Sequence, residues 1–449
     1  MSTPEIETDY LIVGAGAMSM AFADVIFSEQ PDAKMVIVDR RHRPGGHWTD
    51  AYPYVALHQP AAFYGVNSTR LGQGGTDLAS GAEIVAYYHL LMKRFVDSGR
   101  VRYLPMSDHQ GDGRVVSVVD RAPRAEVRAR RRIVDGGFMN VEVPSVTPPK
   151  YEVEPGLALV PPNQLPQMAS AWQRYAIVGA GKTGTDAIVF LLAAGVDPER
   201  IQWIAPHDSW LWLREKVQPG IALAEFLRHA DSLIQAHTVD DIFLHLERTG
   251  SLCRVDATVM PEKWRCATIS AEEFAALQRI RDVVRLGRVR RIASDRIELE
   301  RGSIPTDTRT LHVDCSANGL ARKLAQPLFA PGRITLQSVF MCQQVFSAAI
   351  LAKLALLDLD DIARNAICEV VPHPEYTHDH PTTMLASFRN LMSANRHMPF
   401  WLWRSRLNLL HHETLHRYLA GAVRLHRLMP KLESAVAKML ATATETATA

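Results

Sequence analysis

Two short glycine-rich segments contain the residues of this chain whose spacing points most directly to chemistry. Each follows an apolar run and leads into a helix-forming stretch. In such a turn the first glycine makes the bend, the second lets the backbone approach a diphosphate, and the helix behind it supplies free N–H groups and a positive dipole end. The residues expected to bind are Gly14, Ala15, Gly16, Ala17 and Ser19 in the first segment, and Gly179, Gly181, Lys182, Thr183 and Gly184 in the second. Two such turns predict two dinucleotides, and a βαβ unit that binds no nucleotide is the alternative at each.

The residues that follow each turn differ between the two sites. The run Met35 to Val38 predicts a strand that ends at Asp39, where a carboxylate can accept hydrogen bonds from a ribose diol. The strand expected over residues 201–204 ends instead at Ala205, with neither an acid for a 2′-hydroxyl nor an arginine for a 2′-phosphate. The residues after the second turn therefore leave open whether a dinucleotide bound there carries a 2′-hydroxyl or a 2′-phosphate. Three nearby residues could supply a positive charge: His207, Arg214 and Lys216.

Composition argues against several other classes of protein. Hydrophobic residues make up 47% and charged residues 22% of the chain, as in an ordinary globular protein, and the net charge of +2 gives no electrostatic drive toward nucleic acid or a membrane. We see neither a signal peptide nor an apolar run long enough to span a bilayer, so a cytoplasmic location is expected. The five cysteines include no close pair, and dithiol chemistry beside a cofactor is therefore not expected.

Four landmarks give the chain a family resemblance: the two glycine turns, the loop Gly45-Gly46-His47-Trp48, and the segment from Asp314 to Gly319. With them the chain resembles the two-dinucleotide-binding flavoproteins, and within these the branch of flavin-containing, Baeyer-Villiger and N-hydroxylating monooxygenases. The resemblance implies an α/β fold with two Rossmann-like dinucleotide-binding domains and a helical C-terminal region. The expected boundaries are residues 1–165 and 306–357 for a discontinuous FAD domain, 172–305 for an inserted NAD(P) domain, and 358–449 for the helical extension.

The resemblance also implies roles for single residues. FAD would lie with its diphosphate on the first turn, its ribose on Asp39 and its ring along the loop that ends at Trp48. Asn67 would position the reactive edge of the flavin, and NADPH or NADH would occupy the second turn. The helix that starts near Phe346, with Ser347 as its N-cap, would point its dipole at the flavin. Further cofactor contacts are expected from Arg40, Gly46, His47, Trp48, Gln59 and Gly319.

By this resemblance the protein is an FAD-dependent, NAD(P)H-using oxidoreductase. More specifically, it is expected to be a monooxygenase in which reduced flavin and molecular oxygen form a C4a peroxide that oxidises a small organic substrate. His58 could exchange protons near the flavin, or it could be a buried histidine satisfied by backbone. The histidine of the family's fingerprint before the second turn is absent, since residues 160–173 contain none. A flavin dehydrogenase or oxidase, and a nucleotide-sensing flavoprotein without turnover, are the alternatives.

The C-terminal region carries two weaker patterns. The segment His412-Glu413-Thr-Leu-His416 has the spacing of a zinc site on a helix expected over residues 407–428, but no third ligand can be assigned, so we expect no metal. Three further histidines, His373, His378 and His380, could contact substrate or a metal, but a proline-punctuated surface loop is the expectation there. The helical region could serve as a homodimer surface, and the low-complexity tail over residues 441–449 is expected to be disordered.

Overall fold

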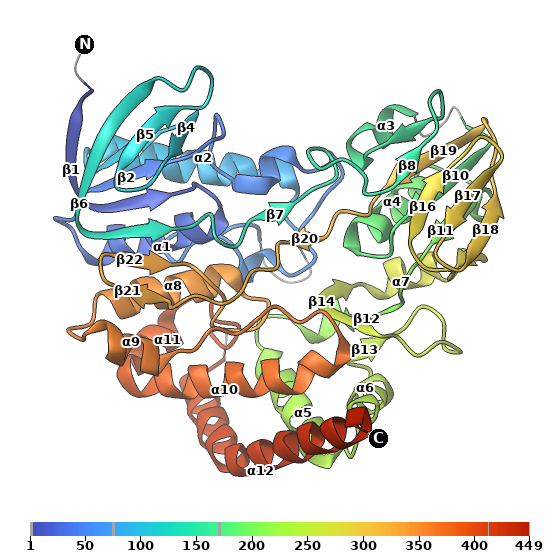
Figure 1. Cartoon of the computed structure of the whole chain (residues 1–449). Helices are drawn as coiled ribbons and strands as arrows, with labels where there is room; N and C mark the ends of the chain where they lie inside the picture. The colour runs from blue at the N-terminus through green and yellow to red at the C-terminus, as the bar shows by residue number, and fades with distance from the viewer. Residues whose placement is uncertain (1–2, 74–76, 169–171, 412, 449) are drawn as a thin grey trace.

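The computed structural model describes residues 3–73, 77–168, 172–411 and 413–448, and it contains two Rossmann-like units and a C-terminal helical region (Figure 1). The second unit is inserted into the first, because the strands of the first sheet come from both ends of the segment that forms the second. This is the α/β fold class expected from the sequence. No helix within these ranges is long and apolar enough to cross a membrane.

The first unit is built on a mixed sheet. Its strands are β1 (Glu5–Val13), β2 (Met35–Val38), β3 (Val101–Leu104), β4 (Ser107–His109), β5 (Arg114–Ser117), β6 (Pro123–Asp135), β21 (Phe329–Ala330) and β22 (Arg333–Thr335). The order β21-β22-β6-β1-β2-β3 places β1 at the centre, parallel to both β2 and β6. All of β2 and most of β1 are buried, as expected of parallel strands covered on both faces.

Two helices of the first unit pack against each other beside this sheet. α1 (Ala17–Glu29) follows the first glycine turn, and α8 (Gln344–Ala355) follows β22; in Figure 1 they lie on the side of the sheet that faces the C-terminal helices. The other long helix of this unit, α2 (Gly81–Asp97), starts at a capping box formed by Ser80 and Glu83 and contacts β3. The first turn is therefore held between a buried strand and a buried helix.

Ser347 does not have the expected role of N-cap. Gln343 is the N-cap of α8, and Ser347 lies inside the helix. Its hydroxyl donates to the carbonyl of Gln343 (2.8 Å) and accepts the N–H of Val339 (3.1 Å). The helix begins earlier than expected because the residues before Ser347 are themselves buried in the helical core, so the hydroxyl joins the preceding loop to the helix instead.

The second unit is built on a five-stranded sheet with the order β15-β11-β10-β19-β9, all parallel. These strands are β9 (Leu159–Val160), β10 (Arg174–Val178), β11 (Ile201–Ile204), β15 (Asp282–Val284) and β19 (Thr310–Asp314). A four-stranded sheet adjoins it, with β8 (Glu152–Val153), β16 (Val289–Ile292), β17 (Arg296–Leu299) and β18 (Gly302–Pro305). Strands β9 and β19 of this unit lie outside residues 172–305, the range expected for the NAD(P) domain.

Further helices, a third sheet and a two-stranded ribbon complete the second unit and its connection to the first. Helix α4 (Lys182–Ala193) follows the second glycine turn, and α3 (Leu165–Met168) and α7 (Ala271–Leu277) are short. A third sheet of β12 (Ser209–Leu213), β13 (Leu252–Cys253) and β14 (Lys263–Ile269) carries α5 (Ala222–Gln235) and α6 (Val239–Arg248). The ribbon of β7 (Val141–Glu142) and β20 (Gly319–Leu320) connects the two units in the middle of Figure 1.

The C-terminal region consists of α9 (Asp361–Ile367), α10 (His380–His397), α11 (Pro399–Arg404) and α12 (Leu415–Thr448). α12 packs against both α10 and α5, so the extension contacts the second unit as well as the first. The expectation of a disordered tail is wrong for the residues up to Thr448, because α12 continues to that point. The tail is rich in alanine, the best helix former, and extending an existing helix requires no new nucleation.

Candidate functional site

The first glycine turn has the geometry of a diphosphate site. Gly14 has a φ of 95°, a conformation that glycine adopts at no steric cost. Gly16 is the N-cap of α1, no side chain caps that helix, and its first turn contains no acidic residue. Ser19, the small residue at the third position of the motif, is buried, and a Cβ built on Gly136 would lie within 1.8 Å of its Oγ. The N–H groups of Ala17 and its neighbours therefore remain suited to an anion.

The loop that starts at Gly45 folds back over this turn. The N–H of Gly45 donates to the carbonyl of Ala15 (2.9 Å), and a Cβ added at Gly46 would lie 2.9 Å from the Cα of Gly16. Only glycine at position 46 permits this approach. The loop continues as a short 3-10 helix, Gly46–Asp50, that carries His47 and Trp48.

Asp39 lies at the expected place but already has partners. It directly follows β2, is 5% exposed, and accepts hydrogen bonds from the N–H groups of Ala15 (2.5 Å) and Arg41 (2.6 Å). Burial raises the pKa of this carboxyl despite those two hydrogen bonds. Asp39 therefore braces the glycine turn in this structure, while each carboxylate oxygen keeps a second lone pair that can accept a hydroxyl.

The other residues expected around the flavin are not all brought together. The indole N–H of Trp48 donates to the hydroxyl of Tyr64 (2.8 Å), which fixes the ring as a wall of the loop. Gln59 accepts from the amide of Gln343 at the start of α8 (2.8 Å), and Asn67 accepts from the hydroxyl of Ser405 (2.8 Å). Three residues point elsewhere: Arg40 forms an exposed ion pair with Asp108, and Phe346 and Ser347 are fully buried in the core.

Burial also makes His47 a neutral residue. Its burial and then the charge of Arg41 lower its pKa to about 4. Its ring lies against that of Trp48, with 5.0 Å between the centroids. His47 therefore contributes an uncharged surface to the loop near neutral pH.

The segment after Trp48 joins the first unit to the second glycine turn. The hydroxyl of Tyr52 donates to Asp186 on α4 (2.6 Å), and the ring of Tyr54 stacks on Phe190 of the same helix at 4.4 Å between centroids. Farther along, Thr268 of β14 donates its N–H to the Nδ1 of His58 (3.4 Å). An aromatic segment without helical periodicity thus lies between the two glycine turns.

The second glycine turn repeats the geometry of the first and opens onto a cavity. A Cβ on Gly179 would lie 2.5 Å from the carbonyl oxygen of Cys315, and one on Gly184 would lie 2.2 Å from the carbonyl oxygen of Gly179. In contrast, a Cβ on Gly181 would meet nothing within 4 Å. Gly181 is the N-cap of α4 with no side-chain cap, so the open space lies where a diphosphate would approach.

This cavity has a volume of about 1090 Å³ and is lined by all three parts of the protein. Lys182 and Thr183 come from the second turn, and Gly319 comes from the connecting ribbon. His58 reaches it from the first unit, and His373 reaches it from the segment between α9 and α10. The cavity is therefore the place where the second nucleotide turn, the aromatic segment and the C-terminal extension meet.

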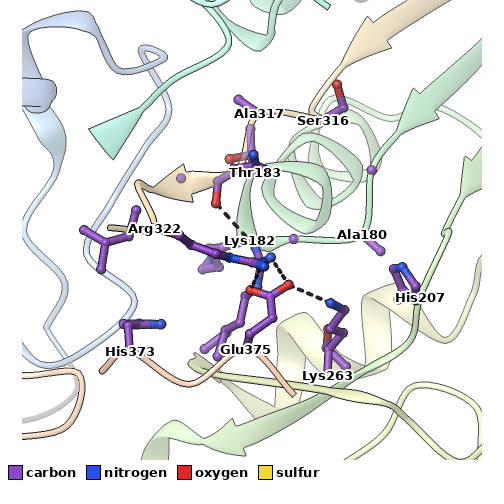
Figure 2. A pocket seen from close by; sticks show the side chains of 18 of the residues that line it. Ala180, Lys182, Thr183, His207, Lys263, Ser316, Ala317, Arg322, His373 and Glu375 are labelled. Carbon is purple, nitrogen blue, oxygen red and sulfur yellow. Dashed lines mark hydrogen bonds and ion pairs between the residues drawn. The ribbon is translucent and has the colours of Figure 1, made fainter. Parts of the chain in front are cut away.

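Glu375 collects three positive side chains on one wall of this cavity (Figure 2). Lys263 contacts its carboxylate at 2.6 Å, and Arg265 and Arg322 both form ion pairs with it. Burial alone would raise the pKa of Glu375, but the hydrogen bonds and charges of Arg265 and Lys263 outweigh it and hold that pKa at about 2. One carboxylate for three cations leaves this wall with a net positive charge that can bind an anionic group.

His58 is a poor candidate for proton exchange. Burial first, and then the charges of Lys182 and Arg214, lower its pKa to about 3. Its backbone carbonyl accepts from the guanidinium of Arg214 (2.9 Å) and from the hydroxyl of Thr268. His58 is thus a partly buried side chain on the cavity wall whose Nδ1 accepts a backbone N–H and whose own backbone joins the first unit to β14.

Two of the three residues suggested as substitutes for the missing arginine lie away from the cavity. Arg214 is buried and forms an ion pair with Glu273 (2.6 Å). Arg214 and Lys216 are also absent from the cavity lining, whereas His207 lies on it. His207 is 3.1 Å from Glu262, so a carboxylate already accompanies it.

The histidines of the C-terminal region do not form the zinc pattern. His412 lies outside the described residues, and α12 begins only at Leu415, so Glu413 and His416 do not share the helix that the pattern needs. His380 is fully buried at the start of α10, with its Nε2 3.1 Å from the Nδ1 of His229, and so is not in a surface loop. Across the described ranges, no group of three or more potential ligands is placed to bind a metal.

The structure corrects the interpretation of the cysteines. Cys266 on β14 and Cys342 just before α8 form a disulfide, although 76 residues separate them in the sequence. A bond between these elements ties the third sheet to the start of α8. The sequence predicts no pair, because no two cysteines are close along the chain, and nothing in the local sequence signals this disulfide.

The cluster around Glu375 was also missed at the sequence level. Glu375 lies 112 residues from Lys263 and joins it only through tertiary packing. A partial signal was present: the acid stands between two of the histidines, His373 and His378, and both of these histidines line the cavity.

Comparisons with known proteins agree with this architecture. No family model matches the chain. It is 42% identical over 424 residues to an uncharacterised protein of Mycobacterium tuberculosis, Rv2000, with 90% of this chain and 78% of that protein covered. Its fold is similar to the polycyclic ketone monooxygenase of Thermothelomyces thermophila (TM-score 0.50, 11% identity, 96% of this chain and 85% of that one). It is also similar to OTEMO in complex with FAD and NADP (TM-score 0.50, 12% identity, 79% and 85%).

The two kinds of likeness carry different weight. Identity of 42% over most of both sequences shows common descent, whereas a structural match at 11–12% identity shows the fold alone. The chain therefore belongs to the family of the mycobacterial protein Rv2000, and its fold is that of the flavin monooxygenases.

Proposed function

We propose that the protein is an FAD-dependent oxidoreductase that uses NADPH or NADH, and that it acts as a monooxygenase on a small organic substrate. One observation carries the proposal: the chain contains two units of parallel strand, glycine turn and uncapped helix, with an aromatic segment between them. Each unit offers free N–H groups to a diphosphate. The fold similarity to flavin monooxygenases supports the same assignment.

The residues of each unit suit a different cofactor. The first turn, with Gly16 and the covering loop at Gly46, would hold the diphosphate of FAD, and Asp39 would accept a ribose hydroxyl. The second turn, with Gly181 open to the cavity, would hold the diphosphate of the nicotinamide cofactor. Bound FAD would supply electron transfer from the reduced nicotinamide to oxygen.

The chain itself would provide binding, orientation and protection from water. The hydrogen bond from Trp48 to Tyr64 holds a flat apolar wall beside the first turn. Tyr52 and Tyr54 close the space between that wall and α4. The exclusion of water by such walls is what a reactive oxygen intermediate requires. The positive wall around Glu375 would orient an anionic part of the cofactor or the substrate.

A direct test is to purify the protein and measure its visible absorption before and after incubation with FAD. We expect a flavin spectrum, and we expect oxygen consumption when NADPH or NADH is added. Incorporation of an atom from labelled dioxygen into an organic product would separate a monooxygenase from an oxidase. Protein that stays colourless after incubation with FAD would overturn the proposal.

Two matched variants assign the cofactors to their turns. Gly16→Ala places a methyl group at an ordinary 3.6 Å from Gly46, and Gly181→Ala places one in open space, so both proteins are expected to fold. We expect the first variant to lose FAD binding while keeping nicotinamide nucleotide binding, and the second to show the reverse. Each variant is thus the control for the other, and loss of both cofactors in either variant would contradict the assignment.

A further inference from the structure

No carboxylate directly follows β11 at the cavity, where an acid could bind the ribose 2′-hydroxyl. The strand ends at Ile204 and is followed by Ala205 and Pro206. The next carboxylate along the chain, Asp208, accepts two hydrogen bonds from the guanidinium of Arg285, at 2.8 and 3.0 Å. An adenosine ribose placed there by the second glycine turn would find no free carboxylate from this segment to bind its diol.

Two arginines occupy the neighbouring edge instead. β15 runs parallel to β11, so the chain leaves both strands at the same edge of the sheet. It continues through Arg288 and Arg290, which are exposed and line the cavity together with Pro206 and His207. Val289 between them is buried, so the two arginines share one face of the strand.

The guanidinium groups of both arginines are available for a ligand. Neither forms an ion pair or a side-chain hydrogen bond with any residue in the described ranges. Glu300 accepts from the backbone N–H of Arg288 (3.0 Å), and Glu262 accompanies His207. Two free guanidiniums in the cavity that the second glycine turn also lines suit a phosphate, which arginine binds through paired N–H donors.

We propose that Arg288 and Arg290 bind a phosphate on the 2′ oxygen of the adenosine ribose, so that the second site takes NADPH in preference to NADH. The inference rests on the proposed function, because it assumes a nicotinamide nucleotide on the second turn. By this inference, the residues that select NADPH over NADH lie on the strand that follows β15. They do not lie at the position after β11, where Ala205 stands.

The test uses two small probes that carry only the adenosine end of each cofactor, 2′,5′-ADP and 5′-ADP. Isothermal titration of the intact protein is expected to give at least about tenfold tighter binding for the probe with the 2′-phosphate, since charge-assisted hydrogen bonds provide the difference. The double variant Arg288→Gln, Arg290→Gln is expected to bind the two probes within about threefold of each other. Its affinity for 5′-ADP should stay that of the unmodified protein.

An arginine on the adjacent strand provides the control. Arg296→Gln removes an exposed guanidinium that pairs with Asp295 and Glu298, and it should leave the preference unchanged. Thermal unfolding of each variant checks that the fold is retained. Equal affinity of the unmodified protein for the two probes would overturn this inference while leaving the second nucleotide site intact. If the protein bound neither probe nor NADPH, the second site of the proposed function would fail and this inference with it.

Discussion

Replacement of Glu375 by glutamine tests whether the cluster of charges in the cavity wall stabilises the fold. Three cations contact one carboxylate, and two of the four groups are nearly buried: the side chains of Lys263 and Glu375 are 6% and 12% exposed. Glutamine keeps the size of the side chain and removes its charge. Lys263 would then lose its counter-charge in a largely desolvated position, which is the costly case for a buried ion pair.

The magnitude follows from the pKa of Glu375. A fall from the ordinary 4.5 to about 2 is equivalent to about 3.4 kcal/mol in favour of the charged form. Arg322 is 60% exposed and Arg265 is 34% exposed, so water screens two of the three pairs. We therefore expect Glu375→Gln to lower the free energy of unfolding at pH 7 by about 2 kcal/mol.

The pH dependence has a definite sign. Because the pKa of Glu375 is lower in the native than in the unfolded state, its ion pairs stabilise the fold fully above pH 4.5 and lose their effect as the pH falls from 4.5 toward 2. The difference between the native protein and the variant should shrink over that range. Urea unfolding at a series of pH values measures it.

An exposed ion pair of the same kind is the control. Glu298 pairs with Arg296 at 2.9 Å, and both side chains are at least one third exposed. Glu298→Gln should change the free energy of unfolding by less than about 0.5 kcal/mol. If Glu375→Gln matched this control at pH 7, or if its effect did not decline in acid, the reasoning about the cluster would be refuted.

Three further predictions follow from single contacts. Gly184→Ala should lower stability by about 1–3 kcal/mol, because its Cβ would lie 2.2 Å from a carbonyl oxygen, whereas Gly181→Ala should be neutral; thermal unfolding compares them. The pKa of His58 is about 3 in the native state, so between pH 6.5 and 5 only the unfolded state binds its proton and the fold loses stability. His58→Gln should therefore lessen the loss of stability over this range, and an unchanged acid profile would contradict this. Cys342→Ser removes the disulfide to Cys266, which closes a loop of 76 residues, and should lower the free energy of unfolding in urea by up to about 4.5 kcal/mol. A native protein whose stability did not change with a reducing agent would contradict this.

The sequence predicts the parts of the site that depend on local geometry. Gly14 takes the positive φ that the strand-to-helix bend requires, and Gly184 allows helix and strand to pack closely. Both requirements concern residues only a few positions apart. The same local logic predicted a strand ending at Asp39, although not that its carboxylate would bind the N–H groups of the turn.

The features that the sequence did not reveal depend on contacts between distant segments. Cys266 and Cys342 meet because β14 lies beside the start of α8, and nothing near either cysteine encodes that arrangement. The N-cap of α8 was misplaced because Ser347 resembles a local capping residue while tertiary burial sets where the helix begins. Local patterns therefore predict turns and strands, and the packing of whole elements decides the rest.

The role of the C-terminal extension follows from the same principle. By composition it is a helical region with a low-complexity tail, which suggested a surface for a second copy of the chain. Its segment between α9 and α10 places His373 and Glu375 in the wall of the cavity, which the second glycine turn also lines. Because Glu375 is the shared counter-charge of Lys263 and Arg322, the extension sets the charge that an incoming ligand meets. The extension is thus part of the candidate site, because it supplies one wall of a cavity that the two Rossmann-like units would otherwise leave incomplete.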